Sequence, residues 1–288
     1  MTVKPGSTSA ERALDAVRAK IAALETGGRG ESESLPFGDP RIDRCFPGGR
    51  GLPLRRWHEV GGEGMETETA AAPAAFAALM ALPLLRKRPA VWITRRDDLH
   101  APGLAGLGFP AGALIEVWAR DEAQALAAAE DALAASGVGV VFVEAQACDL
   151  TAGRRLQLAC EKGQATGFLI ARRPFGGGAA GAAQGSAAAS RWSIAPAPSA
   201  PMAGRPGLGA PRWRATLERC RGGRPGAWLF ESPAAYDDTE IQDGTHPLRL
   251  VADLGDRQLA PTQPAARPAS PAVPFPAGGQ GAPRRRRA

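Results

Sequence analysis

The sequence predicts an α/β domain built on a largely parallel sheet. Short apolar runs rich in β-branched and aromatic residues alternate with segments of helical pattern, which is typical of parallel strands buried on both faces. The chain has 288 residues, 44% of them hydrophobic, which is enough for one large domain with a substantial core. The expected strands are residues 54–60, 90–94, 113–119, 138–143 and 167–171.

Three segments between or after these strands have the composition and punctuation of helices. Residues 69–85 are rich in Ala and Leu, and Pro73 falls near the first turn, where proline is tolerated. Residues 121–136 are rich in Ala and begin with a capping-type Asp. Residues 149–162 place leucines among charges, and Gly163 follows as a stop signal. Such helices supply the crossovers that parallel strands require.

The stretch after the first expected strand has the outline of a phosphate-binding loop without its lysine. A working loop reads G-x-x-x-x-G-K-[ST] between a strand and a helix. Here Gly62 is the first glycine, Thr67 replaces the second glycine, Glu68 replaces the lysine, and Thr69 keeps the hydroxyl. Backbone N–H groups and the lysine normally surround the phosphates, whereas a carboxylate repels them. We expect the scaffold without its phosphate chemistry; an ordinary strand-to-helix turn is the alternative.

Four stretches of sequence carry a resemblance to a known family. They are LPFGDPRID (residues 35–43), HEVGG (58–62), RRLQLACE (154–161) and GAPRWRATLERCRGGRPGAWLFE (209–231), of which the last is the most specific. They resemble the ImuA family of RecA-like accessory factors, over roughly residues 35–231. The wider order resembles the RecA-type ATPase core, through GLP (51–53) before the strand 54–60, LHAPGLAGLG (99–108), ALAASGVGVVFVE (132–144) and LTAGRRLQLA (150–159). The resemblance implies a RecA-like fold and a non-catalytic role in error-prone translesion DNA synthesis during the SOS response to DNA damage.

The resemblance also implies that the residues that catalyse ATP hydrolysis in the RecA type are altered in this chain. The position where the RecA type places a glutamate to activate water falls near Arg95 and Arg96. The acid that ends the third core strand and helps to hold Mg²⁺ in such enzymes, the Walker B acid, corresponds to Glu144. A surface carboxylate at a strand end is the alternative for Glu144. With Glu68 in place of lysine, we expect no ATPase activity, no cofactor, and no catalytic or metal-binding residues.

The partners implied by the resemblance are proteins of the same mutagenesis system. They are an ImuB-like homologue of Y-family polymerases and an error-prone replicative polymerase subunit, and self-association is a further option. Two other functions stay open: a SulA-like inhibitor of cell division and an active RecA-like DNA-dependent ATPase. Glu68 argues against the ATPase. SulA-type chains are shorter and would not need the arginine-rich region described next.

Basic charge gathers in residues 172–224, which hold nine arginines against one acid, a net charge of +8 where the whole chain has +6. In the RecA type, single-stranded DNA binds to the loop that corresponds to residues 172–191 of this chain. Arginine beside tryptophan suits phosphate contact and base stacking. The competing interpretation is the solvated face of a two-stranded ribbon, in which Trp213, Ala215, Leu217 and Arg219 share one face. The candidate residues for binding nucleic acid or a partner are Arg172, Arg173, Arg191, Trp192, Arg212, Trp213, Arg214, Arg219, Arg221 and Arg224.

The two ends of the chain differ in composition from the core. Within residues 1–34, apolar residues at helical spacing predict a helix over 9–26 that docks on its own domain or on a neighbouring subunit. The core is expected over 35–253, with a mobile Gly/Ala loop at 174–190 and a disordered tail rich in Pro, Ala and Arg at 254–288. Neither a membrane span nor a signal peptide is expected, and four widely spaced cysteines predict a reducing cytoplasm.

Overall fold

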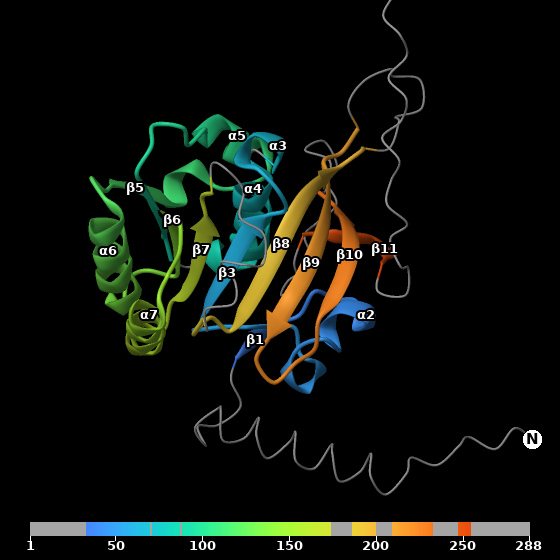
Figure 1. The fold of residues 1–288 in the computed structure, drawn as a ribbon, viewed down its shortest axis with the longest axis horizontal. Helices are drawn as coiled ribbons and strands as arrows, with labels where there is room; N and C mark the ends of the chain where they lie inside the picture. Colours follow the sequence, from blue (N-terminus) through green and yellow to red (C-terminus); the bar gives the residue numbers. More distant parts are fainter. Residues whose placement is uncertain are drawn as a thin grey trace, which may run out of the picture. The chain divides into compact units, whose positions relative to one another are not determined.

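The computed structural model describes residues 33–69, 71–86, 88–173, 186–199, 209–232 and 247–254. These residues form a mixed α/β fold around one large sheet (Figure 1). The helix predicted over 9–26, most of the predicted Gly/Ala loop, and residues 255–288 lie outside the described residues. Residues 186–190, the last five of that loop, are described, and their side chains are buried.

The sheet has nine strands in the order β11-β10-β9-β8-β3-β7-β6-β4-β5. Every neighbouring pair from β8 to β5 is parallel, and every pair from β8 to β11 is antiparallel. The prediction of a large, mostly parallel sheet is confirmed. The strands are β3 (Trp57–Gly62), β4 (Ala90–Thr94), β5 (Leu114–Trp118), β6 (Val140–Ala145), β7 (Thr166–Ala171), β8 (Ser190–Ala197), β9 (Arg212–Cys220), β10 (Gly226–Glu231) and β11 (Arg249–Asp253). A separate small sheet pairs β1 (Ser34–Leu35) with β2 (Leu52–Pro53).

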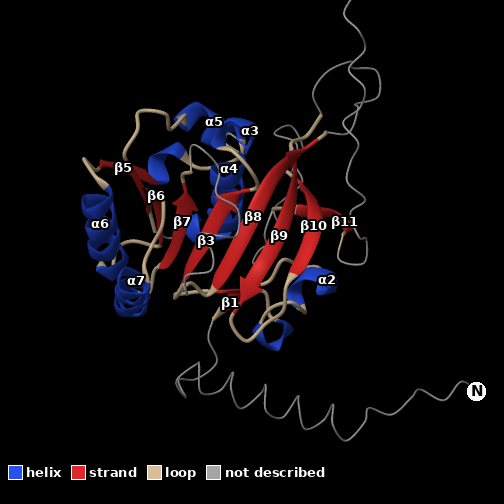
Figure 2. Ribbon diagram, viewed as in Figure 1, coloured by secondary structure: helices blue, strands red, loops and turns tan. Residues whose placement is uncertain are grey.

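Helices cover both faces of the parallel part of the sheet (Figure 2). Helix α4 (Ala72–Ala81) packs on β3, β7 and β8, whereas α6 (Glu122–Ala134) and α7 (Leu150–Gly163) pack on the other face. Aspartates cap the latter two helices: Asp121, the predicted cap, accepts from the Gln124 N–H at 2.8 Å, and Asp149 accepts from the Ala152 N–H at 2.7 Å. The shorter elements are α2 (Pro40–Asp43), η1 (Pro47–Gly49), α3 (Glu66–Thr69), η2 (Leu82–Arg86), α5 (Ala101–Gly106) and η3 (Ala111–Ala113).

Each face of the sheet has its own apolar core. On the α4 face, Phe76 lies at the centre of an aromatic group, with ring centroids 5.7 Å from Trp192 and 5.5 Å from Phe230. On the other face, Leu133 of α6 and Leu156 of α7 are buried among the valines of β6. Burial of aromatic and branched side chains on both sides explains why β6 and β7 read as continuous apolar runs.

The helix predicted over residues 69–85 is divided in the structure. Helix α3 already begins at Glu66, α4 begins after Ala71 with Pro73 in its first turn, and α4 ends at Ala81. Pro83 lies in the 3₁₀ turn that follows, where its missing N–H and its ring prevent the α-helix from continuing.

The predicted alternation along β9 is wrong at its C-terminal end. Trp213 and Leu217 are buried as expected, but the pairing with β8 shifts so that Trp192 pairs with Leu217 and Arg191 with Arg219. Glu218 is therefore an extra residue, and such a bulge changes the alternation by one position. As a result Arg219 lies beside Arg191 and not on the face of Trp213.

Candidate functional site

The loop between β3 and α3 is filled by its own side chains. The Glu68 carboxylate accepts a hydrogen bond from the Met65 N–H at 2.9 Å, an arrangement known from helix capping boxes. A Cβ on Gly64 would lie 2.5 Å from the same carboxylate oxygen, and a Cβ on Gly62 would lie 2.4 Å from Thr69 Oγ1. The carboxylate thus occupies a backbone N–H that a working loop offers to phosphate.

On the side of Gly62 and Gly64, this loop leaves little space. The cavity against Gly62, Gly64 and Thr69 measures about 20 Å³, which is room for about one water molecule. Thr67, the other altered position, is exposed on α3. A triphosphate does not fit this cavity as the side chains lie.

Glu144, the candidate Walker B acid, is 4% exposed at the end of β6, so the alternative of a surface carboxylate is wrong. Its Oε1 accepts from Trp92 Nε1 at 2.9 Å, while Oε2 lies 3.4 Å from Thr94 Oγ1 and 3.4 Å from an Arg172 nitrogen. Burial raises the pKa of the Glu144 carboxyl, against the opposing effects of Trp92 and Arg172. Both oxygens are therefore already bonded within the fold. No group of three His, Cys, Asp or Glu side chains among the described residues could hold a metal ion.

Arg172 is the centre of an ionic network at the C-terminal edge of the parallel strands. It pairs with Glu66 at 2.7 Å, with Asp98, and with Glu144, and Arg96 also pairs with Glu66, at 2.8 Å. Burial lowers the pKa of the Arg172 guanidinium, but the three carboxylates reverse this and leave the pKa raised. Sequence reasoning missed Glu66 and Asp98 because they come from α3 and from the turn after β4, which only the fold brings together.

Arg173 after β7, Arg191 of β8 and Arg219 of β9 are held by acceptors from other segments. Arg191 pairs with Glu59 at 3.0 Å, and Arg173 lies 3.5 Å from the same carboxylate. Arg219 donates to the carbonyl oxygens of Ser186 and Ala188 at 2.7 and 3.1 Å.

The arginines on the open face of β9 are also paired. Arg212 contacts Glu231 at 2.6 Å, and Arg214 contacts Glu63 at 2.8 Å. Arg221 is exposed in the turn after β9, as is a second candidate in that turn, Arg224. The high net charge of this segment is thus largely offset in space by acids of β3, the loop after it, and β10.

The two candidate tryptophans are not available for base stacking, so that prediction is wrong. Trp192 is 1% exposed, and its Nε1 donates to Ser190 Oγ at 3.0 Å. Trp213 is 5% exposed, because the alternation of β9 turns its ring toward α4. Only an edge of Trp213 lines a neighbouring pocket.

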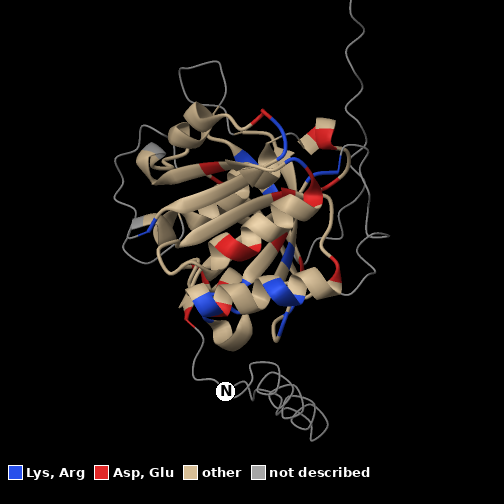
Figure 3. Cartoon of the chain, turned by 90° about the vertical axis from the view of Figure 1, so that its left-hand side faces the viewer, with Lys and Arg blue, Asp and Glu red and all other residues tan. Residues whose placement is uncertain are grey.

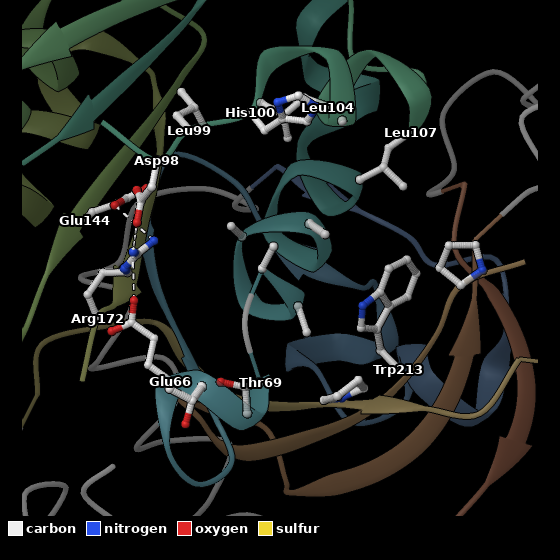
Figure 4. A pocket seen from close by; sticks show the side chains of 18 of the residues that line it. Glu66, Thr69, Asp98, Leu99, His100, Leu104, Leu107, Glu144, Arg172 and Trp213 are labelled. Atoms are coloured by element: carbon white, nitrogen blue, oxygen red, sulfur yellow. Dashed lines mark hydrogen bonds and ion pairs between the residues drawn. The ribbon is translucent and has the colours of Figure 1, made fainter. Parts of the chain in front are cut away.

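That pocket has a volume of about 900 Å³. Figure 4 shows Leu104, Leu107 and Trp213 around its apolar part, with Glu66, Arg172 and their ionic partners at the other end. Its walls come from α3, α4, α5 and the ends of β8 and β9, which are stretches far apart in the chain. For this reason no local pattern of residues indicates it.

The helical side of the molecule shows no comparable concentration of one charge. Figure 3 looks at the side that carries α6 and α7, where basic and acidic residues are interspersed. One pair joins the two helices, with Arg155 at 2.5 Å from Glu130.

Comparison with known proteins agrees with the sequence resemblance. Over 242 residues the chain is 54% identical to Protein ImuA of Caulobacter vibrioides strain NA1000 / CB15N, an alignment that covers 82% of this chain and 96% of that protein. The chain belongs to the ImuA family. The ImuA of C. vibrioides strain ATCC 19089 / CIP 103742 / CB 15 matches to the same extent. No family model matches the sequence.

Among solved structures, the crystal structure of SulA from Pseudomonas aeruginosa aligns with 41% of this ImuA-family chain and 98% of its own. The TM-score is 0.35 and the sequence identity 21%. A similarity of this size decides neither fold nor function. No helix in the described part of the chain is long and apolar enough to cross a membrane.

Proposed function

We propose that this chain is a non-catalytic, RecA-like accessory factor for error-prone translesion DNA synthesis in the response to DNA damage. Membership of the ImuA family supports the role in mutagenesis. The strand–loop–helix order after β3 and the acid at the end of β6 support a RecA-like origin of the core. The non-catalytic character rests on one observation: the Glu68 carboxylate, in the lysine position, is bonded to the Met65 N–H.

The chain acts, in this proposal, by binding an ImuB-like polymerase homologue and an error-prone replicative polymerase subunit. Partner proteins are favoured over single-stranded DNA, because Arg172, Arg191, Arg212 and Arg214 are engaged by carboxylates. The stacking residues that single-strand binding would use are also buried.

The proposed function is tested by deleting the gene for this chain in the organism that carries it. Mutation frequency after ultraviolet irradiation should fall to the level of a strain without the ImuB-like partner, and the double deletion should be no lower. The tagged chain should co-purify with that partner. Unchanged mutation frequency, together with filamentous cells on overproduction, would favour the SulA-like alternative instead.

A further inference from the structure

The 900 Å³ pocket between α3, α4 and α5 borders the filled phosphate loop, since Thr67, Glu68 and Thr69 are among its lining residues. It is distinct from the cavity of about 20 Å³ against Gly62 and Gly64. We propose that the larger pocket binds a short apolar peptide segment that carries a lysine or arginine and belongs to a partner protein. This assignment rests on the proposed partner-binding function, and it adds the surface and the chemistry of the contact.

The shape of the pocket suits bulky apolar side chains. Its volume lies within the range of sites that enclose organic ligands, roughly 300–1,000 Å³. On one wall the residues are small, Ala71, Ala74 and Ala75 of the α4 N-terminal turns, which leaves the space open. On the other side Leu104 and Leu107 present branched side chains, and removal of such surface from water drives binding.

The charge of the pocket excludes an anionic occupant. Four acids line it, Glu66, Glu68, Asp98 and Glu144, against two arginines, Arg96 and Arg172. Both arginines already contact those acids, and although Arg172 Nε is buried without a hydrogen bond in the described part of the chain, four carboxylates against two guanidinium groups leave the lining with a net charge of −2. Nucleotides and acidic peptides are therefore repelled.

The same residues leave acceptors for a cation. Within the described residues, Glu66 Oε2 is buried without a hydrogen bond, and the Asp98 side chain is 43% exposed although it contacts Arg172. A lysine or arginine of the occupant would donate hydrogen bonds to these carboxylate oxygens, and such charge-assisted hydrogen bonds are stronger than neutral ones.

The two halves of the pocket set the pattern of the occupant. Figure 4 places the ionic group at one end and Leu107 and Trp213 at the other, so the ligand must be apolar at one end and cationic at the other. A peptide with apolar residues beside a basic residue has this pattern within a few residues. The ImuA-family chain would then hold its partner at the site where a related enzyme acts on phosphates.

The test uses a library of random peptides displayed on phage, selected against the full chain. The recovered peptides should combine apolar residues with Lys or Arg, and synthetic labelled copies should bind with affinities measurable by fluorescence anisotropy. Ala71→Trp, which fills the pocket, should weaken binding at least about tenfold, and Asp98→Lys should weaken it through charge. Ala127→Trp on α6 is the matched control, since Ala127 is an exposed helical alanine outside the pocket, and it should leave binding unchanged.

Recovery of no peptide, recovery of acidic peptides, or equal binding to the Ala71→Trp and Ala127→Trp chains would overturn the assignment. A comparison of complete deletion with the Ala71→Trp variant in the organism separates this inference from the proposed function. If complete deletion lowers induced mutation frequency while Ala71→Trp does not, the proposed function stands and the pocket assignment fails. If deletion itself has no effect, the proposed function fails.

Discussion

At the scale of single residues, His58 shows how the HEVGG stretch holds two strands together. Its ring is fully buried; Nε2 lies 3.0 Å from the Pro53 carbonyl oxygen and Nδ1 lies 2.7 Å from Ser190 Oγ. Because a carbonyl oxygen only accepts, Nε2 carries the proton, and Nδ1 accepts from the Ser190 hydroxyl. Ser190 in turn accepts from Trp192 Nε1. The neutral ring is thus completely bonded, and its role is structural.

His58 should make the stability of the protein depend on pH. Burial, the largest cause, lowers the pKa of its imidazole from 6.5 to about 4. The unfolded chain therefore binds the proton more readily than the folded chain. The contribution of His58 to the free energy of unfolding, roughly 3 kcal/mol, is fully present above about pH 6.5 and is lost as pH falls toward 4. Denaturant unfolding at several pH values should show that His58→Gln removes this component. His100→Gln, at an exposed histidine, should keep it; equal pH profiles for both variants would contradict the assignment.

At the same scale, the sequence predicted which residue types had changed but not what they contact. The sequence places Glu68 where a phosphate-binding loop carries its lysine, and the loss of phosphate binding that we expect from this reversal of charge stays a prediction. The bond from Met65 to Glu68 and the pairing of Arg172 with three acids were not predictable, since they depend on side-chain positions set by the whole fold.

At the scale of elements, strand and helix positions were predictable because local patterns carry them. The strand over 90–94 coincides with β4, and the predicted Asp cap, Asp121, marks the start of α6. The end of α7 differs: Gly163 is its last residue, and Gln164 takes the left-handed φ of +57°. Gly163 is needed instead for space, since a Cβ there would lie 2.0 Å from the Leu133 carbonyl oxygen of α6. Likewise, the bulge at Glu218 depends on pairing with β8 and has no local signature.

Replacing Gly163 should therefore separate the C-terminal ends of α6 and α7. We expect Gly163→Ala to lower the free energy of unfolding by about 1–3 kcal/mol through overpacking. Gly106→Ala is the control, because a Cβ at Gly106 in α5 meets nothing within 4 Å. This control should leave stability unchanged or raise it by at most about 1 kcal/mol. A Gly163→Ala chain as stable as the Gly106→Ala chain would mean that the helices do not pack as described.

At the scale of the whole molecule, the net charge of residues 172–224 was a poor guide to the surface, because acids distant in sequence neutralise many of its arginines. Glu59, Glu63 and Glu231 reach the arginines of residues 172–224 from β3, the loop after it, and β10. The fold class was predictable from the alternation of strands and helices, whereas the ionic network and the pocket arise from segments that meet only after folding.

This distribution of charge predicts which arginines contribute to any affinity for single-stranded DNA. Replacing Arg212 and Arg214 with Ala should leave the salt dependence unchanged, because Glu231 and Glu63 already neutralise them. Replacing the exposed Arg221 and Arg224 should flatten the log–log slope by roughly 1.4, or about 0.7 for each phosphate that is no longer neutralised. Fluorescence anisotropy with a labelled oligonucleotide at several salt concentrations measures this. A larger effect from the first pair would show that the ion pairs open on binding.

Calorimetric titration with ATP and Mg²⁺ tests most directly whether the phosphate loop of this ImuA-family chain is closed to nucleotides, as we propose. At ~4 Å and an effective dielectric constant near 20, one pair of unit charges interacts by about 4 kcal/mol. Exchange of the lysine for Glu68 should therefore lower affinity by on the order of a thousandfold or more. We expect no saturable heat of binding up to roughly millimolar ATP. Micromolar binding would contradict the closed loop.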